Sequence, residues 1–323
     1  MKSPGFWQHD GALARLLAPL GAVYAAATAR RVAQPGWRAP VPVICCGNAS
    51  AGGTGKTTLA LDLATRLIAA GWNPAFLTRG YGGRGRGPRR IGPDDDAAQT
   101  GDEALLLAAV APAYAGADRA ATARLAVADG ADVLVLDDGL QNPSLAKDLS
   151  LLVIDGEAGF GNGRAIPAGP LREPVAAAAA RCQAAVLIGP DRNGALAMLP
   201  PDLPVLHASL HPPPDAAWLR GQRVLAFAGI GRPEKFFTTL AQTGAVIAAR
   251  RSFPDHHRYT APELAALLDT AGRLRAMPVT TPKDAARLPP LLRARIRAVG
   301  VAMRWQDASA LEALLGRVLT PGQ

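Results

Sequence analysis

A glycine-rich stretch between a β-rich segment and a helical segment has residue types that bind phosphate. Glycines let backbone N–H groups converge on phosphate oxygens at the positive end of a helix, Lys56 reaches the β and γ phosphates, and Thr57 can ligate Mg²⁺. Ser50 stands where the common pattern has its first glycine, so the strict motif is missed by one residue. We predict that a nucleotide binds to the loop formed by Ser50, Ala51, Gly52, Gly53, Thr54, Gly55, Lys56, Thr57 and Thr58.

Two adjacent carboxylates end a later β-rich segment. Asp137 and Asp138 close the run DVLVLDD. Open parallel sheets bind ligands at the carboxyl ends of their strands, and Mg²⁺ on a nucleotide needs an acidic partner there. Beside a phosphate loop, this pair therefore predicts a metal-binding role. The alternative is a surface turn in which Asp138 and the following glycine only reverse the chain.

Groups that can accept a proton occur in two further stretches. Asp102 and Glu103 lie in TGDEALLLA at a predicted helix start, where acidic residues also favour the helix dipole, so capping is the competing interpretation. FPDHHRYT places His256 beside Asp255 and His257 in a chain with only 5 histidines. A histidine can take up a proton near neutral pH, and a neighbouring carboxylate can raise its basicity. An ordinary loop histidine is the alternative for this stretch.

The elements that position these residues follow a regular alternation after residue 40. Short β-rich runs alternate with helical stretches, which predicts βαβ units, a largely parallel sheet and an α/β fold of the P-loop NTPase type. Helices are expected over residues 56–70, 102–111 and 119–129. Strands are expected over residues 41–47, 74–78, 132–138, 149–155, 184–189 and 204–209.

A proline-rich stretch, residues 211–223, interrupts this alternation and indicates a linker. A second set of elements follows it, and a chain of 323 residues exceeds what one core usually fills. We therefore predict a phosphate-loop domain over residues 1–220 and a smaller α/β domain over residues 221–323. In the second domain, strands are expected over residues 223–231, 245–249, 277–281 and 296–303, and helices are expected to begin at Pro233 and Thr260.

The composition is that of a globular protein with a basic charge. Hydrophobic residues make up 49% of the chain and charged residues 19%, and the net charge is +9. The arginine excess favours contacts with phosphates and anionic surfaces. Aromatic residues are only 5% and no motif that reads DNA or RNA is present, so we predict no nucleic-acid partner. Cys45, Cys46 and Cys182 make a poor disulfide framework, which favours a reduced, cytoplasmic-side protein.

An apolar run near the N-terminus suggests contact with a membrane surface. The 14 residues Leu16–Ala29 are bracketed by arginines and are too few to span a bilayer as a helix. With Trp7 before the run, the segment over about residues 7–31 suits a helix that lies at the interface beside anionic headgroups. An alanine-rich helix packed on the domain is an equal alternative.

Three classes of phosphate-loop protein compete for this pattern. Dimeric switch ATPases of the partition and nitrogenase-reductase type carry an extra lysine before the two loop glycines, where this chain has Ala51. A GTPase is disfavoured because no N-K-x-D guanine-binding signature is present. ATP chemistry on a bound acceptor is the most natural interpretation, although Ala51 weakens rather than excludes a switch ATPase.

Taken together, the motifs resemble those of the tetraacyldisaccharide 4'-kinase family of the lipid A pathway, nearly from end to end. The combination of these elements in this order is highly specific. The resemblance also accounts for Ser50, because that family does not keep the leading glycine. The matching stretches are FWQHDG, GNASAGGTGKTT, LTRGYGG, TGDEA, LDDGLQN, GFGNGRAIPAGPLREP, FAGIGRPEKFF, FPDHHRYT and TTPKDAARL.

The resemblance implies an ATP-dependent kinase at the cytoplasmic face of the inner membrane. It would transfer the γ-phosphate to the 4'-hydroxyl of an acylated glucosamine disaccharide 1-phosphate, giving lipid IVA. Lys56 and Thr57 would hold the triphosphate and Mg²⁺, and Asp102 would be the catalytic base, assisted by His256. The other implied site residues are Arg119 for charge on the γ-phosphoryl group, Asp137, Asp138, Glu103 and Gln141 for the metal or phosphates, and Arg172 and Glu173 as further candidates.

The chain departs from the family pattern at three positions. Leu140 and Asn142 replace an aromatic residue and a histidine, and Pro282 replaces a glutamate. None of these positions has an assigned chemical role, so activity is expected to be retained. Two rival functions remain at this point: a membrane-recruited switch ATPase of the partition type and a kinase of a soluble small molecule.

Overall fold

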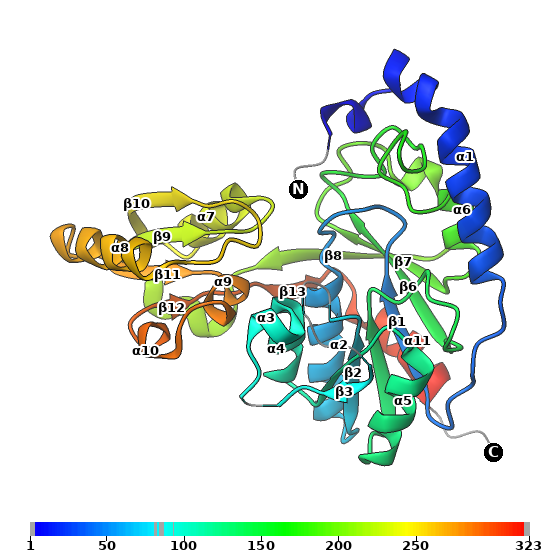
Figure 1. Ribbon diagram of the computed structural model, residues 1–323, viewed down its shortest axis with the longest axis horizontal. Helices are drawn as coiled ribbons and strands as arrows, with labels where there is room; N and C mark the ends of the chain where they lie inside the picture. The colour runs from blue at the N-terminus through cyan, green and yellow to red at the C-terminus, as the bar shows by residue number, and fades with distance from the viewer. Residues whose placement is uncertain (1–3, 81–82, 84–86, 93, 320–323) are drawn as a thin grey trace.

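A mostly parallel sheet forms the centre of the first domain. The computed structural model describes residues 4–80, 83, 87–92 and 94–319. Within these residues, nine strands form one sheet in the order β13-β8-β7-β6-β1-β5-β2-β4-β3 (Figure 1). Only β3 and β13 run antiparallel to their neighbours among these strands. The other seven are β1 (Val43–Gly47), β2 (Pro74–Thr78), β4 (Ala113–Ala115), β5 (Val133–Asp137), β6 (Leu149–Asp155), β7 (Ala184–Ile188) and β8 (Val205–His211).

Helices cover both faces of this sheet. One face packs against α2 (Lys56–Ala69), α4 (Asp102–Ala108) and α11 (Ala308–Leu319), and the other against α5 (Arg119–Ala128) and α6 (Val175–Ala179). Because both faces are covered, every residue of β1 and of β5 is buried, which explains why these strands read as continuous apolar runs. The predicted α/β class with a parallel sheet is confirmed.

The second domain is a smaller α/β unit. In the described residues its sheet has four parallel strands in the order β10-β9-β11-β12. Helix α7 packs on one face and α8 on the other. This domain lies to one side of the first, in yellow and orange (Figure 1). Its elements are β9 (Arg223–Ala228), α7 (Pro233–Gln242), β10 (Val246–Ser252), α8 (Ala261–Arg273), β11 (Met277–Thr280), α9 (Pro282–Ala286), α10 (Pro290–Arg293) and β12 (Arg297–Ala298).

The chain returns to the first domain after β12. Strand β13 (Ala302–Trp305) pairs antiparallel with β8, and α11 packs against the core of the large sheet through Leu311 and Leu315. The single strand expected over residues 296–303 is therefore two strands, which belong to different sheets. Residues 302–319 accordingly belong to the first domain, which corrects the expected range of 221–323 for the second.

Short elements connect the larger ones. Neither β3 (Arg89–Arg90) nor β4 was expected from the sequence, because strands of two and three residues show no periodicity. The remaining short elements are η1 (Gly5–Gln8), α3 (Ala97–Thr100), η2 (Leu196–Met198) and η3 (Pro214–Leu219), the last of which lies in the predicted linker.

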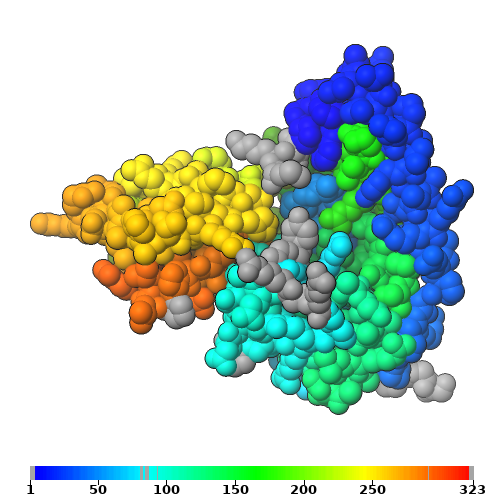
Figure 2. Space-filling model, in the orientation of Figure 1, coloured from blue at the N-terminus to red at the C-terminus, as the bar shows by residue number. Residues whose placement is uncertain are grey.

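Helix α1 (Ala12–Val32) lies along the outer edge of the first domain, away from the second (Figures 1 and 2). Ala14, Gly21 and Thr28 face the domain, and a Cβ on Gly21 would lie 2.8 Å from the carbonyl oxygen of Ala165. By length and composition, α1 is the one helix in the described part of the chain that could cross a membrane. It has 21 residues and is thus longer than the apolar run of 14 on which the expectation of an interfacial helix rested.

Candidate active site

The phosphate loop connects β1 to α2 at the carboxyl edge of the large sheet. Gly55 immediately precedes α2 with a φ of 93°, and Gly52 has a φ of 126°. Glycine adopts such values without strain. A Cβ on Gly55 would also lie 2.6 Å from Cδ1 of Ile188. The positive φ therefore requires glycine at position 55, whereas Ile188 could move aside, and the loop meets the start of a helix, as a phosphate site needs.

Lys56 and Asp138 form an ion pair beside this loop. The Lys56 side chain is nearly buried, and its Nζ lies 3.6 Å from Oδ1 of Asp138. Arg172 donates two further hydrogen bonds to the same carboxylate, over 2.7 and 3.1 Å. Burial alone would raise the pKa of Asp138, but Lys56 and Arg172 outweigh it and hold the pKa below its ordinary value. Asp138 is therefore a carboxylate that already balances two cations.

Asp137 is the more suitable of the two carboxylates for a cation. It is 2% exposed, and its Oδ2 accepts a hydrogen bond of 3.0 Å from the Thr57 hydroxyl. Its Oδ1 is buried and has no hydrogen-bond partner among the described residues. Burial, together with the negative charge of Glu103, raises the pKa of Asp137 to about 7. An unpartnered buried oxygen beside a threonine hydroxyl fits a divalent cation that is also held by a nucleotide.

No complete metal site is assembled from protein groups alone. Within the described residues, no three His, Cys, Asp or Glu side chains are arranged to hold a metal ion. Mg²⁺ usually takes one or two carboxylates and completes its shell with phosphate oxygens and water. Thr57 and Asp137 therefore fit such an ion, whereas Asp138 and Glu103 face cationic side chains in this structure.

The stretch PAGPLREP, residues 167–174, lies against the phosphate loop and is hydrogen-bonded to it. The N–H of Ala51 donates to the carbonyl of Pro170, and the N–H of Arg172 donates to the carbonyl of Ala49, each over 2.7 Å. These bonds bring the stretch PAGPLREP into the site. Gln141 joins the same region, because its Nε2 donates to the carbonyl of Asn48 and to Glu173, each over 2.8 Å.

Asp102 and His256 meet across the two domains. Asp102 begins α4 and is 4% exposed, and its Oδ2 lies 3.2 Å from Nδ1 of His256. The hydrogen bond with Asp102 raises the pKa of His256. Burial alone would raise the pKa of Asp102, but His256 and Arg287 hold it well below the ordinary range of a carboxylate. The structure thus brings together two groups that are 154 residues apart in the sequence.

Two cations of the second domain also reach α4. Lys283 forms an ion pair with Glu103, and Arg287 donates to Oδ2 of Asp102 through Nε, over 2.9 Å, and through Nη2. Neither cation was expected from the sequence. Their four-residue spacing in TTPKDAAR places them on one side of a helical turn, and this spacing is the signal that could have revealed them.

Arg119 lies at the first position of α5 and is 2% exposed. Its Nη1 donates to the carbonyl of Gly116 rather than to a group of the phosphate loop. Burial lowers the pKa of Arg119 to about 10, although Asp138 counteracts the shift. The guanidinium is therefore still charged at neutral pH and contributes to the potential at the site without direct contact with the loop.

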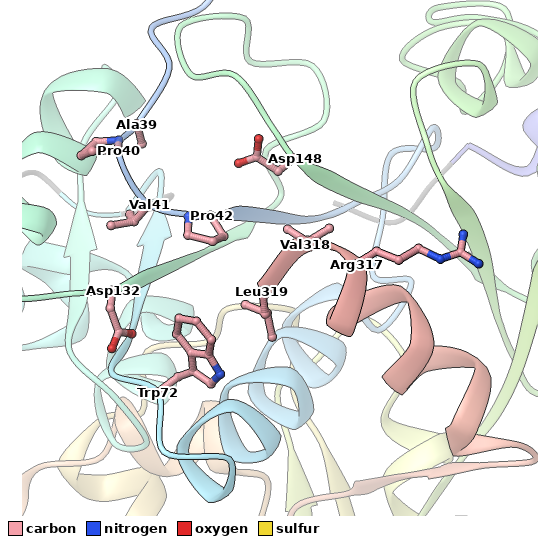
Figure 3. Close-up of a pocket in the computed structure, with 10 residues that line it drawn as sticks. All are labelled: Ala39, Pro40, Val41, Pro42, Trp72, Asp132, Asp148, Arg317, Val318 and Leu319. Atoms are coloured by element: carbon pink, nitrogen blue, oxygen red, sulfur yellow. The ribbon is translucent and has the colours of Figure 1, made fainter. Parts of the chain in front are cut away.

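A cavity lies elsewhere, at the opposite edge of the sheet. It has a volume of about 530 Å³, and its lining includes Trp72, Asp132, Asp148 and Arg317 (Figure 3). Residues 39–42, Trp72, Asp132 and Asp148 all precede parallel strands. Because ligands of open α/β sheets bind at the carboxyl ends of strands, this cavity is not the nucleotide site.

The fold and the site define a phosphate-loop α/β protein in which an aspartate of one domain meets a histidine of the other. Comparison with known proteins agrees and identifies the family. The sequence model described as tetraacyldisaccharide-1-P 4'-kinase matches residues 13–320. The chain belongs to this family.

Similar proteins cover the full length of the chain. The tetraacyldisaccharide 4'-kinase of Gluconacetobacter diazotrophicus is 58% identical over 98% of this chain and 97% of its own length. That of Rhodospirillum centenum is 56% identical over 99% of this chain and 97% of its own length. The crystal structure of the "apo" form of LpxK from Aquifex aeolicus in complex with ATP matches with a TM-score of 0.75, at 26% identity, over 95% of this chain and 99% of that chain.

Proposed function

We propose that the protein transfers the γ-phosphate of ATP to the 4'-hydroxyl of tetraacyldisaccharide 1-phosphate, which gives lipid IVA in lipid A biosynthesis. The observation that carries this proposal is the contact of Asp102, at the start of α4 in the first domain, with His256 of the second domain, 3.2 Å apart. A kinase needs a proton acceptor near the γ-phosphate, whereas a nucleotide-dependent switch has no such need. The family to which the chain belongs supports tetraacyldisaccharide 1-phosphate as the molecule that receives the phosphate.

The nucleotide would be held by the first domain. The loop from Ser50 to Thr58 would surround the phosphates, and Lys56 would neutralise the β and γ phosphates once they displace Asp138 from it. Mg²⁺, when bound, would balance charge on the phosphates. Thr57 and Asp137 are the best candidates to hold this ion, and Asp138 and Glu103 are the further candidates.

The acceptor hydroxyl would lose its proton to the pair formed by Asp102 and His256. Its oxygen would then attack the γ-phosphorus, and the bond from this phosphorus to the β–γ bridging oxygen would break to release ADP. Positive charge near the transferred group would come from Lys56, Arg172 and Arg119. Such positioned charge supplies most of the catalysis in phosphoryl transfer. Gln141 would help to order the phosphates through its place between the loop and Glu173.

Because the acceptor is a lipid, the protein must reach a membrane surface. We propose that this surface is the cytoplasmic face of the inner membrane. The outward side of α1 supports this placement. It exposes a stripe of apolar side chains, of which Leu16 is 76% and Val23 69% exposed. Arg15, Arg30 and Arg31 flank the stripe and suit anionic headgroups. Because the opposite side of α1 packs on the first domain, the helix would lie on the membrane rather than cross it.

A transfer assay separates this function from its main rival. Purified protein, ATP labelled in its γ-phosphate and the acylated disaccharide 1-phosphate should give labelled lipid. Hydrolysis of ATP at an equal rate with and without lipid, and no label in the lipid, would instead indicate a switch ATPase of the partition type. Ala51 argues against this rival, because the extra lysine of such proteins is missing.

A further inference from the structure

Arg287 is held rigidly within the second domain. Its side chain is 6% exposed, and Nη1 donates to the carbonyl of Gly229 over 2.9 Å and to Oδ1 of Asp284 over 3.0 Å. Asp284 is itself fully buried and accepts hydrogen bonds from Tyr259, from Thr281 and from the N–H of Gly229. The guanidinium therefore has a fixed position relative to its own domain before it meets the first.

Arg287 and His256 share two acceptors. The carbonyl of Gly229 accepts from Arg287 and from the backbone N–H of His256, the latter over 3.1 Å. Oδ2 of Asp102 accepts from Arg287 and lies 3.2 Å from Nδ1 of His256. One guanidinium thus contacts both the backbone support of the histidine and the carboxylate that the histidine faces. A planar fork with several donors suits this bridging, which a lysine could not reproduce in full.

The backbone of His256 needs such support. His256 has a φ of 57°, a left-handed value that costs free energy for any residue other than glycine. The close packing of Gly229 reinforces the arrangement, because a Cβ there would lie 3.0 Å from Oδ1 of Asp284 and 3.1 Å from Cβ of His257. The loop that carries His256 is therefore kept in place by surrounding contacts rather than by its own preference.

We propose that Arg287 is a positioning residue for the phosphoryl transfer, which aligns His256 of the second domain with Asp102 of the first. The inference rests on the proposed function, because it assigns these two groups to proton transfer from the acceptor. Arg287 contacts Asp102 and His256 directly, and it acts on the transfer by holding these two groups in place.

The structure offers a matched control in another ion pair between the domains. Arg232 contacts Asp155 over 2.8 Å, and Lys235 contacts Glu157 over 2.9 Å. Asp155 ends β6, on the other side of β1 from β5 and Asp137. Arg232 is 44% exposed, and its ion pairs do not involve Asp102 or His256. Replacement of Arg232 thus removes an arginine that joins the domains and leaves the pair of reacting groups intact.

The first test compares Arg287→Met, Arg287→Lys and Arg232→Met in steady-state transfer to the lipid. Arg287→Met should lower kcat about 10²-fold, since a misplaced group of this kind typically costs that much, and should leave the KM for ATP within about twofold. Arg287→Lys should recover part of the loss, and Arg232→Met should retain near wild-type kcat. An increase in the KM for ATP at unchanged kcat, or an equal loss in Arg232→Met, would overturn the proposal.

A double-mutant cycle with His256→Ala distinguishes positioning from general stabilisation of the fold. If Arg287 acts through His256, adding Arg287→Met to the His256→Ala variant should lower kcat by less than about a further twofold. A full 10²-fold loss in that background would show that Arg287 acts independently of the histidine, contrary to the proposal.

A measurement without lipid keeps the two proposals separate. The chain has 5 histidines, so ring nitrogen signals can be recorded after ¹⁵N-histidine labelling and those of His256 assigned by their loss in His256→Ala. Both Arg287 variants should shift the His256 signals, and Arg232→Met should leave them in place. Unchanged signals in Arg287→Met would refute positioning. If wild-type protein labelled no lipid, the proposed function would fail, while these signals would still decide the role of Arg287.

Discussion

The phosphate-binding region and the contact between the domains are built in opposite ways. The loop, Lys56, Asp137 and Asp138 all come from the first domain. The loop follows β1, and the two aspartates lie at the end of β5, which is the neighbour of β1 in the central sheet. The pair of Asp102 and His256 depends on a contact between elements 154 residues apart. The first region lies within one domain, whereas the second exists only while both domains are in contact.

This difference separates binding from chemistry. A change in the phosphate loop should affect nucleotide affinity and transfer together. A change at the contact between the domains should affect transfer and spare nucleotide affinity. Replacing a residue that connects the domains away from the reacting groups, such as Arg232, should change neither nucleotide affinity nor transfer strongly. The following variants test this separation, from the largest expected effect to the smallest.

Asp102→Asn should give the largest loss of transfer. Removing a proton acceptor typically costs 10² to 10⁴ in rate, so we expect kcat to fall about 10³-fold while the dissociation constant of ATP stays within about threefold. Labelled-lipid assays and equilibrium binding of ATP measure the two quantities. Asp215→Asn, an exposed acid in the linker region, is the control and should behave as wild type. Equal losses of binding and transfer would contradict the separation.

Lys56→Met should impair both quantities. The lysine is nearly buried beside Asp138, and its loss removes the charge that we propose neutralises the β and γ phosphates. We expect kcat to fall about 10²-fold, as for loss of one preorganised donor, and ATP affinity to fall as well. Arg66→Met, on the same helix but paired with Asp62 and Glu312, should leave both unchanged. Normal ATP affinity in Lys56→Met would place the nucleotide elsewhere.

Glutamates on the outward side of α1 should weaken membrane binding and leave both regions of the site intact. The double variant Leu16→Glu and Leu20→Glu replaces two exposed apolar side chains. We expect roughly tenfold weaker flotation with anionic vesicles and near-normal kcat on detergent-dispersed lipid. Leu291→Glu is the control, since Leu291 is 88% exposed on the second domain. Unchanged flotation of the double variant would refute a membrane role for α1.

The effect of His256→Ala on stability should depend on pH, because His256 lies in the contact between the domains. Asp102 raises the pKa of His256 above 6.5, so the contact stabilises the fold fully below about pH 6.5, and this contribution is lost as pH rises through the folded-state pKa. The lowered pKa of Asp102 keeps that group ionised throughout this range. His256→Ala should therefore lower Tm more at about pH 6 than at about pH 9, by a few degrees at most.

Calorimetric or fluorescence unfolding of wild type and His256→Ala checks this prediction. His207→Ala, which removes an exposed histidine of β8, provides the matched control and should lower Tm equally at both pH values. A difference between wild type and His256→Ala that grows with pH would have the wrong sign and would exclude the ion pair as its source.

Much of the first domain could be predicted from the sequence, because most of its strands are buried on both sides. Six expected strands were found, and five of them are buried along their whole length and read as apolar runs, as strands covered by helices on both faces must; the sixth, β8, is partly exposed. Strands β3 and β4 were missed because two or three residues carry no periodicity. The apolar pattern predicts one strand over residues 296–303, where the structure has β12 and β13 in different sheets, because such a pattern shows that a segment is extended but not which sheet it joins.

The sequence alone determined the phosphate loop and the family, because both depend on the order and identity of neighbouring residues. Gly55 and Lys56 are adjacent in the chain, so the role predicted for them depends only on local spacing. The contact of Asp102 with His256, and the contacts of Arg287 with both, are visible only in the folded protein. Such contacts depend on how two domains approach each other, and no local preference of the chain encodes that distance.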